Sequence, residues 1–413
     1  MAYLDRQRAS KLMTQAHLDG LIFFSPENFL YATGVSSGVA MMWRKAGAVA
    51  VFVPANPNTP ETAVVSDLFV QSFKDSSHIK DVRESPIWVE SNNLDDYDPI
   101  EDPQVIISSL RRNAERNMEF TRPTTFDPSI CFKHLADAIS ESGLNRANIG
   151  FEASAVSIRE FSELQANLSN INLIDGTDVI DRLKMVKSAA EVKNLRLAVE
   201  IAESGLCAVR DAIIPEITRD ALATVWADAI NRHPKCDNLS GAWEYISVGP
   251  NPWVGGRPAK SGDLIKVDVG CRVNGYTSDS ARTFVLGQPN KLQEQIFEAL
   301  LAGFNVGAKM LSPGIPLSEV HRVTQDAIRN AGFPHYTRGH FGHGLGAGLG
   351  SEEWPFIAAD ATSVFEPGMV VAFECPWYIN GVGGLIIENQ VLITESGHEM
   401  MNSLPLELVS VAI

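Results

Sequence analysis

The sequence predicts an α/β (α+β) protein with two domains, residues 1–180 and 181–413. Three observations support this. The chain has 413 residues, 45% of them hydrophobic, which is enough for a large core and favours two domains over one. Strand and helix patterns alternate through the first domain, as in an α/β unit. In the second domain, long helical patterns lie beside apolar strands that each carry a lone acid.

The first domain is predicted from short elements. Residues 4–18 have the apolar spacing of a helix, and an apolar strand at 20–24 is broken by Pro26. The other elements predicted here are strands at 48–53 and 149–152 and a helix at 158–168. We find no motif with chemical meaning in this domain, so we expect the function to reside in the second.

The second domain opens with a strong helix signal. Ser188 and Glu191 have the spacing of a capping box, which starts an amphipathic helix that runs to about residue 213. The last helical pattern follows Pro316 and stops at Gly332. The helices predicted after the first are 218–232, 290–312 and 317–331.

Charge and cysteine usage limit the partners and the compartment. The formal net charge is −16 and no run of Lys or Arg is present, so we expect neither nucleic acid nor an anionic membrane as a partner. The five cysteines are scattered without CxxC spacing, which is typical of reduced thiols in a cytoplasmic protein. No apolar run has the length of a secretory segment or a membrane span.

Two aspartates lie in neighbouring predicted strands. In Asp263–Gly270, alternation places Ile265 and Val267 on one face and Asp268 on the other. The strand at 276–284 carries Asp279 after a turn, and a hairpin would bring the two carboxylates together. Either acid alone is more readily interpreted as a surface or turn residue. The pair favours a bound cation, which would relieve their repulsion.

The glycine-rich segment 339–350 contains two histidines. It predicts a turn with close backbone approach, and His343 in that turn is a candidate metal ligand. His340, three residues earlier, competes for the same role. The glycines lack GxGxxG spacing after a strand, so a dinucleotide site is not expected.

Two glutamates complete the candidate site. Glu374 and Glu388 are each the lone acid of an apolar strand, and Gly381–Gly384 forms the turn between these strands. Burial of two unpaired carboxylates would cost several kcal/mol each. A shared divalent cation is the simplest account, with an edge strand that exposes its acid to water as the alternative.

The ordered set of these five residues resembles the pita-bread metallopeptidases, the methionine aminopeptidase/prolidase/creatinase superfamily. The flanking segments Ser261–Asp263, Arg282–Phe284 and Pro367–Val370 are also similar. The resemblance covers residues 180–413 strongly and residues 1–180, which look like a creatinase/prolidase N-terminal domain, more weakly. It implies a pita-bread catalytic domain. The metal ligands it implies are Asp268, Asp279, His343, Glu374 and Glu388.

The resemblance also implies a function. It predicts a metal-dependent hydrolase of Xaa-Pro peptidase type that cleaves a C–N amide bond of a dipeptide or small peptide-like substrate with metal-activated water. Glu374 and His343 are the candidate catalytic residues, with Glu374 as general base. Two divalent ions are expected: Mn²⁺ first, because oxygen ligands dominate, with Zn²⁺, Fe²⁺ or Co²⁺ as alternatives. The resemblance implies a homodimer.

The chain departs from that superfamily in the groups that usually grip a peptide. The segment 249–253 has no histidine, Ser351-Glu352-Glu353 replaces a usual His-Glu, and Ile386 stands where an arginine often precedes the last glutamate. These departures favour an alternative, a small-metabolite enzyme. It would resemble creatinase or ectoine hydrolase, or dimethylsulfoniopropionate lyase. A non-enzymatic binding protein is a third hypothesis, although such relatives usually lose metal ligands.

Four residues are candidates for binding the substrate. Trp253 and Trp377 lie near site-forming segments and offer aromatic walls to a small or cationic molecule. Arg338 offers a partner for a carboxylate, and His340 lies beside the candidate ligand His343. For each tryptophan the alternative is a core position, and for Arg338 a solvated surface position.

Overall fold

The structure is a computed structural model that describes residues 3–88, 102–114, 125–253, 257–348 and 352–413. The chain divides into two compact units, Met1–Leu183 and Lys184–Ile413. Ser351, one of the residues at which the chain departs from its resemblance, lies outside the described residues.

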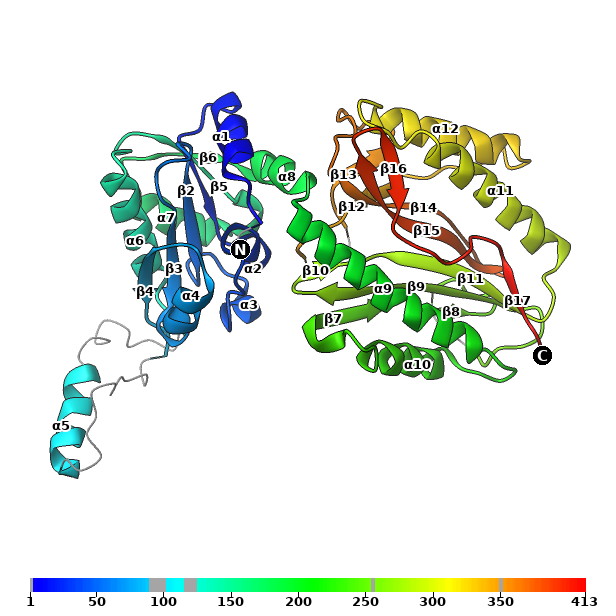
Figure 1. Cartoon of the computed structure of the whole chain (residues 1–413), viewed down its shortest axis with the longest axis horizontal. Coiled ribbons are helices and arrows are strands. Elements are labelled where there is room, and N and C mark those ends of the chain that lie inside the picture. The colour runs from blue at the N-terminus through cyan, green and yellow to red at the C-terminus, as the bar shows by residue number, and fades with distance from the viewer. Residues whose placement is uncertain (1–2, 89–101, 115–124, 254–256, 349–351) are drawn as a thin grey trace. The chain divides into compact units, whose positions relative to one another are not determined.

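The N-terminal unit is a sheet with several of its helices packed against it (Figure 1). The described strands form one sheet in the order β4-β3-β2-β1-β5-β6, with β1 antiparallel to β2 and parallel to β5. The strands are β1 (Gly20–Phe23), β2 (Ala50–Pro54), β3 (Thr62–Ser66), β4 (Asp81–Ser85), β5 (Asn148–Phe151) and β6 (Asn172–Asp175). The helices are α1 (Arg6–Gln15), α2 (Pro26–Thr33), α3 (Ala40–Trp43), α4 (Val70–Ser76), α5 (Pro103–Ala114), α6 (Pro128–Glu141), α7 (Ile158–Asn167) and α8 (Thr177–Met185), the last of which ends at the junction with the second unit.

Both faces of this sheet are buried. On β1, Leu21 and Phe23 belong to one hydrophobic cluster, whereas Ile22 belongs to another that includes residues of α6. The alternation of strand side chains separates the two clusters. The predicted α/β class of this unit is confirmed by the sheet and by its helices.

The C-terminal unit is built around a larger sheet, with helices on its outside (Figure 1). The main strand order is β10-β9-β11-β15-β14-β12-β13, and β7 and β8 pair with β9. The helices are α9 (Ala189–Asp211), α10 (Arg219–Asn231), α11 (Lys291–Ala308) and α12 (Leu317–Asn330). The strands are β7 (Leu239–Glu244), β8 (Ser247–Val248), β9 (Leu264–Val273), β10 (Tyr276–Thr277), β11 (Ser280–Leu286), β12 (His340–Gly344), β13 (Glu353–Ala358), β14 (Val370–Ile379), β15 (Gly383–Thr394), β16 (Gly397–Met400) and β17 (Val409–Val411).

The four helices cover one face of this sheet, called here the helix face. Ile265, Val267 and Val269 of β9 pack with residues of α9 and α10, and Phe373 and Ile387 pack with residues of α11 and α12. Residues with the other parity of these strands point to the opposite face, called here the site face. The helix face of the sheet is thus apolar and packs against the helices, whereas the site face carries the polar candidate residues.

Two sequence predictions need correction. The strand expected at 276–284 is divided into β10 and β11, and Asp279 lies in the break between them. The segment around His343 is not a turn but the strand β12, paired with β13 and β14. Gly342 explains why glycines suit this strand. Its φ is +141°, and a side chain would meet the Ala372 carbonyl oxygen of β14 at 2.0 Å.

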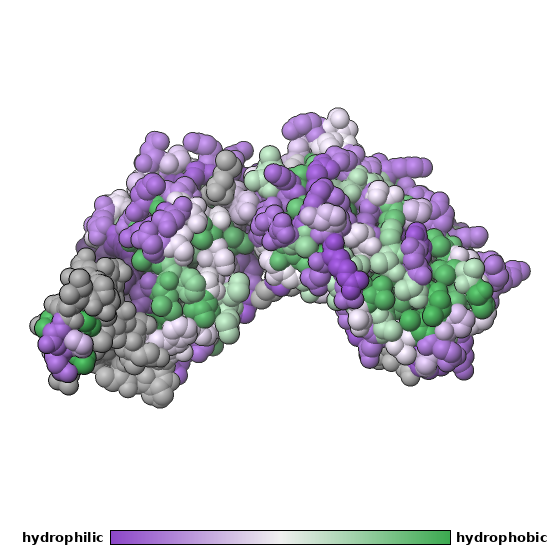
Figure 2. Space-filling model, turned by 60° about the horizontal axis from the view of Figure 1, so that its bottom comes forward, coloured by the Kyte–Doolittle hydropathy of each residue, from purple (hydrophilic) through white to green (hydrophobic). Residues whose placement is uncertain are grey.

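The visible surface of each unit is largely hydrophilic, with hydrophobic residues gathered in patches (Figure 2). The five cysteines are free thiols, and three of them, Cys131, Cys271 and Cys375, are buried. Over the part of the chain that is described, no helix combines the length and the apolar character needed to cross a membrane.

Candidate metal centre

Strand pairing places three candidate residues on the site face. Asp268 pairs with Ala281, Ala281 pairs with Glu388, and Glu388 pairs with Glu374, so a single row crosses β9, β11, β15 and β14. Directly paired residues share a face of the sheet. Three acids from strands far apart in sequence therefore line one surface, with strands about 4.8 Å apart.

Asp279 and His343 reach the same surface on one side of this row. Asp279 lies two residues before Ala281, and His343 pairs with Ala372, two residues before Glu374. A spacing of two residues keeps a strand side chain on the same face. All five predicted metal ligands thus belong to the site face, and each is largely buried.

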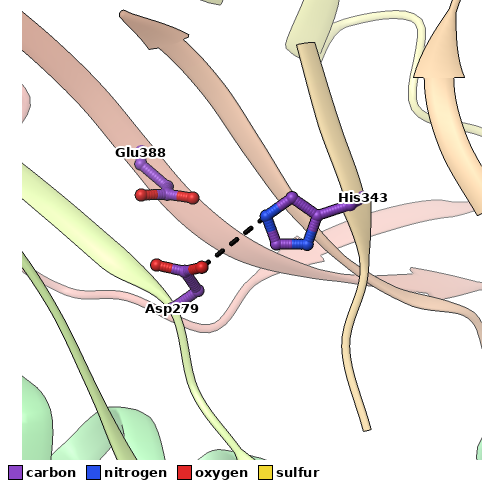
Figure 3. Close-up of side chains that lie close together, drawn as sticks. All are labelled: Asp279, His343 and Glu388. Atoms are coloured by element: carbon purple, nitrogen blue, oxygen red, sulfur yellow. Dashed lines mark ion pairs between the residues drawn. The ribbon is translucent and has the colours of Figure 1, made fainter. Parts of the chain in front are cut away.

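Three of the five residues converge (Figure 3). One ligand atom each from Asp279, His343 and Glu388 lies within 4.8 Å of the other two, and the Asp279 Oδ2 is 3.6 Å from the His343 Nε2. We call this group the three-residue cluster. Two carboxylates and an imidazole are a donor set that Mn²⁺, Fe²⁺, Co²⁺ or Zn²⁺ accepts. The chemistry of these residues therefore fits a divalent ion.

The backbone selects which nitrogen of His343 faces the cluster. Its Nδ1 lies 3.0 Å from the carbonyl oxygen of Gly344. A carbonyl only accepts hydrogen bonds, so Nδ1 donates, and the neutral ring presents the lone pair of Nε2 towards Asp279. A hydrogen bond of this kind on the distal nitrogen is the usual way in which proteins orient a metal-binding histidine.

The pKa values of the carboxyls reflect their crowding. Burial, followed by the neighbouring Asp279 carboxylate, raises the pKa of Glu388 well above its usual value. Burial also raises the pKa of Asp268 to about 6, against the opposing effect of Lys266. Buried acids held close together favour protons or cations. The site face therefore attracts positive charge.

Asp268 and Glu374 do not join the three-residue cluster, and each has a cationic side chain beside it. The Asp268 Oδ2 is 3.3 Å from the Lys266 Nζ, and the Glu374 Oε1 accepts a hydrogen bond of 2.8 Å from Arg338. Burial acts to lower the pKa of Arg338, but the Glu374 carboxylate outweighs it and the pKa is raised. Arg338 is thus a partner of a candidate ligand and not a solvated surface residue.

His340 lies at the edge of the same region. Its Nδ1 is 3.6 Å from the Glu374 Oε1, its ring is 6.0 Å from that of His343, and burial lowers its pKa. Two residues three apart on a regular strand point to opposite faces, but the pairing of β12 with β13 is irregular between these histidines. The irregularity lets both histidines approach the acids.

The two candidate tryptophans lie in different places. Trp253 is 46% exposed, and its ring lies 4.7 Å from that of Tyr378. Trp377 pairs with Leu385 on the helix face, and its ring packs against those of Phe333 and Tyr336. The expectation that Trp377 contacts substrate is therefore corrected, because the alternation of β14 turns it away from Glu374 and towards the core.

Sequence reasoning missed three residues of the site face. Lys266 is completely buried, and its Nζ lies 3.7 Å from the ring centre of Tyr245 and 5.3 Å from that of Tyr378. The spacing held a signal for the lysine, since a residue two before Asp268 on a strand shares its face. The two tyrosines gave no such signal. Tyr378 belongs to β14 and Tyr245 precedes β8, and only the folded sheet brings both rings close to Lys266.

Another departure from the resemblance has a structural explanation. Glu353 of β13 forms ion pairs with two lysines: its Oε1 lies 2.8 Å from the Lys184 Nζ, and its Oε2 lies 3.7 Å from the Lys187 Nζ. Glu353 therefore stabilises the contact between β13 and the segment before α9. Ile386 is buried on the site face, two residues before Glu388.

The chain matches two known protein families. Residues 193–395 match metallopeptidase family M24, and residues 6–92 and 102–186 match the creatinase/prolidase N-terminal domain. Among curated proteins, an Xaa-Pro dipeptidase of Pyrococcus furiosus is 31% identical over 306 residues, 71% of this chain and 84% of the relative. The uncharacterized peptidase YqhT of Bacillus subtilis is 29% identical over 282 residues, 66% of this chain and 77% of the relative.

Solved structures share the fold over almost the whole chain. Dipeptidase PepE of Mycobacterium ulcerans has a TM-score of 0.75 at 24% identity and covers 99% of this chain and 97% of its own. The prolidase of Pyrococcus horikoshii OT3 has a TM-score of 0.74 at 22% identity, over 98% of this chain and 99% of its own. At these identities the structures establish the architecture of both units.

Proposed function

Because the chain belongs to metallopeptidase family M24 and is therefore a metal-dependent hydrolase, we propose that it cleaves the C–N amide bond of an Xaa-Pro dipeptide or a similar small peptide. The observation that carries this proposal is the three-residue cluster of Asp279, His343 and Glu388. The name of the Pyrococcus furiosus relative, an Xaa-Pro dipeptidase, supports the substrate class.

The proposed chemistry divides between a divalent ion and the side chains. A bound ion would acidify a water molecule and polarise the carbonyl of the scissile amide. Glu374, beside the cluster on the site face, would accept a proton from the attacking water and deliver it to the leaving nitrogen. Arg338, which donates to Glu374 at 2.8 Å, would hold that carboxylate in position. His343 would present Nε2 as a ligand.

Three finer features belong to the same proposal. Manganese is the first expectation for the metal because the donors are mostly carboxylates. We also propose the homodimer that the resemblance implies, and exposed hydrophobic side chains of the C-terminal unit such as Ile214 and Leu292 are candidates for its interface. Light scattering at micromolar concentration checks the dimer. Free thiols support a cytoplasmic location.

An assay of the manganese-loaded protein against a panel of Xaa-Pro dipeptides tests the function. We expect turnover, and we expect Asp279→Asn to lose more than about 100-fold of it, since loss of residues that merely orient a ligand costs about 10–100-fold. Asp360→Asn is the matched control, because this aspartate is exposed in the same unit.

The controls separate two failures. Full activity of Asp279→Asn, with Asp360→Asn also active, would rule out the metal-dependent mechanism. A metal-loaded protein that turns over none of the dipeptides would rule out the substrate class and leave the family assignment intact.

A second candidate substrate class is a small metabolite. The observations that favour it are Ile386 in place of an arginine beside the last glutamate, and the absence of histidine from segment 249–253. The enzyme would then resemble creatinase or ectoine hydrolase, or dimethylsulfoniopropionate lyase. Turnover of creatine, ectoine or dimethylsulfoniopropionate, with no turnover of dipeptides, would establish this alternative.

A further inference from the structure

We propose that the Lys266 ammonium takes the place of a second metal ion, so that this centre holds a single ion on Asp279, His343 and Glu388. This inference rests on the proposed metal centre and concerns how many ions it holds. It departs from the two ions that the resemblance implies.

The distribution of cations over the site face is the first argument. Of the five candidate ligands, Asp268 has the Lys266 Nζ at 3.3 Å, and Glu374 has Arg338 at 2.8 Å. The remaining three residues form the three-residue cluster. The chain thus supplies its own cation to each of the two acids that do not join the cluster.

The position of Lys266 is fixed by its surroundings. The residue is completely buried, and its ammonium lies over the Tyr245 ring at 3.7 Å and near the Tyr378 ring at 5.3 Å. The face of an aromatic ring attracts a cation, most strongly where water is excluded. The Lys266 stem runs over Gly384, where an added Cβ would lie 3.1 Å from the Lys266 Cδ. The ammonium therefore has a built site beside Asp268.

The charges of the site face support a single divalent ion. Asp268 and Glu374 each have a cationic side chain within 3.3 Å, whereas the three-residue cluster offers two carboxylates and one imidazole to an ion. A second ion on Asp268 would lie close to the Lys266 ammonium, and the two cations would repel each other in a site with little water.

Metal content of the full chain tests the proposal directly. The protein is stripped of metal, reloaded with Mn²⁺ and dialysed, and manganese per chain is measured by mass spectrometry and by the electron paramagnetic resonance spectrum. We expect one isolated ion in the wild type. We expect two spin-coupled ions in Lys266→Met, because that variant frees Asp268. Lys260→Met, which removes an exposed lysine from the same segment, serves as the matched control and should hold one ion.

Two results would overturn the proposal: two coupled ions in the wild type, or a single ion in a folded Lys266→Met protein. If Lys266→Met fails to fold by circular dichroism, the wild-type spectrum decides alone. A wild type that binds no manganese and no other transition metal would instead overturn the proposed metal centre, so the two failures are distinguishable.

Discussion

Trp253 and Trp377 show how far the role of a residue depends on the face it occupies. Trp253 is 46% exposed beside Tyr378, on the side of β14 that carries Glu374, whereas Trp377 is partly buried and packs with Phe333 and Tyr336 against the core. The same residue type is therefore proposed to contact substrate at one position and packs against the core at the other.

We predict that truncation separates these roles. Trp253→Ala should raise KM about 3–10-fold with little change in Tm, because it removes an exposed aromatic contact worth about 1 kcal/mol. Trp377→Ala should lower the free energy of unfolding by about 3 kcal/mol, because it leaves a gap in the core. Dipeptide kinetics and chemical denaturation of both variants check this. An unchanged KM in Trp253→Ala would contradict the proposed contact.

A second residue-scale prediction concerns Arg338, a positioning residue that acts through Glu374. Arg338→Gln should lower kcat about 10–100-fold with a small change in KM, since the carboxylate loses the donor that orients it. Arg338→Lys should restore part of kcat through its remaining charge. Arg322→Gln on α12 is the control, because that arginine pairs with Glu319 at an exposed position. Equal losses of kcat in Arg338→Gln and Arg322→Gln would contradict the positioning role assigned to Arg338.

At the scale of elements, Glu353 connects β13 to the segment that leads into α9. Its carboxylate lies 2.8 Å from the Lys184 Nζ, and the Lys187 side chain, 3.7 Å away, is only 1% exposed. Burial acts to raise the pKa of Glu353, but the two lysines outweigh it and the pKa is lowered. The ionised pair is therefore part of the folded state.

We predict that Glu353→Gln destabilises the protein by about 3–5 kcal/mol at neutral pH, because two buried lysines lose their counter-charge. A lowered folded-state pKa means that this stabilisation is present above the ordinary glutamate pKa of about 4.3 and is lost as pH falls through the folded value. The Tm difference between wild type and variant should thus shrink only below about pH 4.3. A difference that is already lost at neutral pH would contradict this account.

At the scale of the whole molecule, the two units should respond differently to metal removal. All five candidate ligands lie in the unit Lys184–Ile413. A ligand present at about 100 times its dissociation constant stabilises the fold that binds it by about 2.7 kcal/mol. A chelator should therefore lower the Tm of a C-terminal transition and leave an N-terminal one in place, as measured by calorimetry. An equal shift of both transitions would contradict this assignment.

The effect of the chelator should also depend on pH. Burial and the neighbouring Asp279 raise the pKa of Glu388 well above the ordinary glutamate value of about 4.3, so protonation of Glu388 stabilises the metal-free fold at low pH, and that stabilisation is lost as pH rises through the folded-state pKa. Metal binding requires the ionised carboxylates that dominate at higher pH. The gap in Tm between metal-loaded and chelated protein should therefore widen between about pH 5 and about pH 7.5. A gap that narrows over this range would contradict the raised pKa.

Local patterns determined most of the elements. The capping box of Ser188 and Glu191 starts α9 as predicted, and helix α12 follows the stop and start signals around Pro316 and Gly332. Such signals act within one or two turns of a helix, so they can be read from the sequence. The prediction of a turn around His343 was wrong. Its glycines are typical of a turn, but here they allow the close packing of β12 against β14.

The sequence by itself determined the two-unit α/β architecture, the family, and the five residues proposed as ligands, because ordered motifs and hydrophobic periodicity are local properties. Only the tertiary structure decided which residues meet. It gathered Asp279, His343 and Glu388, set Arg338 beside Glu374, and brought Tyr378 close to Lys266. These contacts depend on the register of strands up to about a hundred residues apart, which backbone pairing across the sheet establishes and no local pattern records.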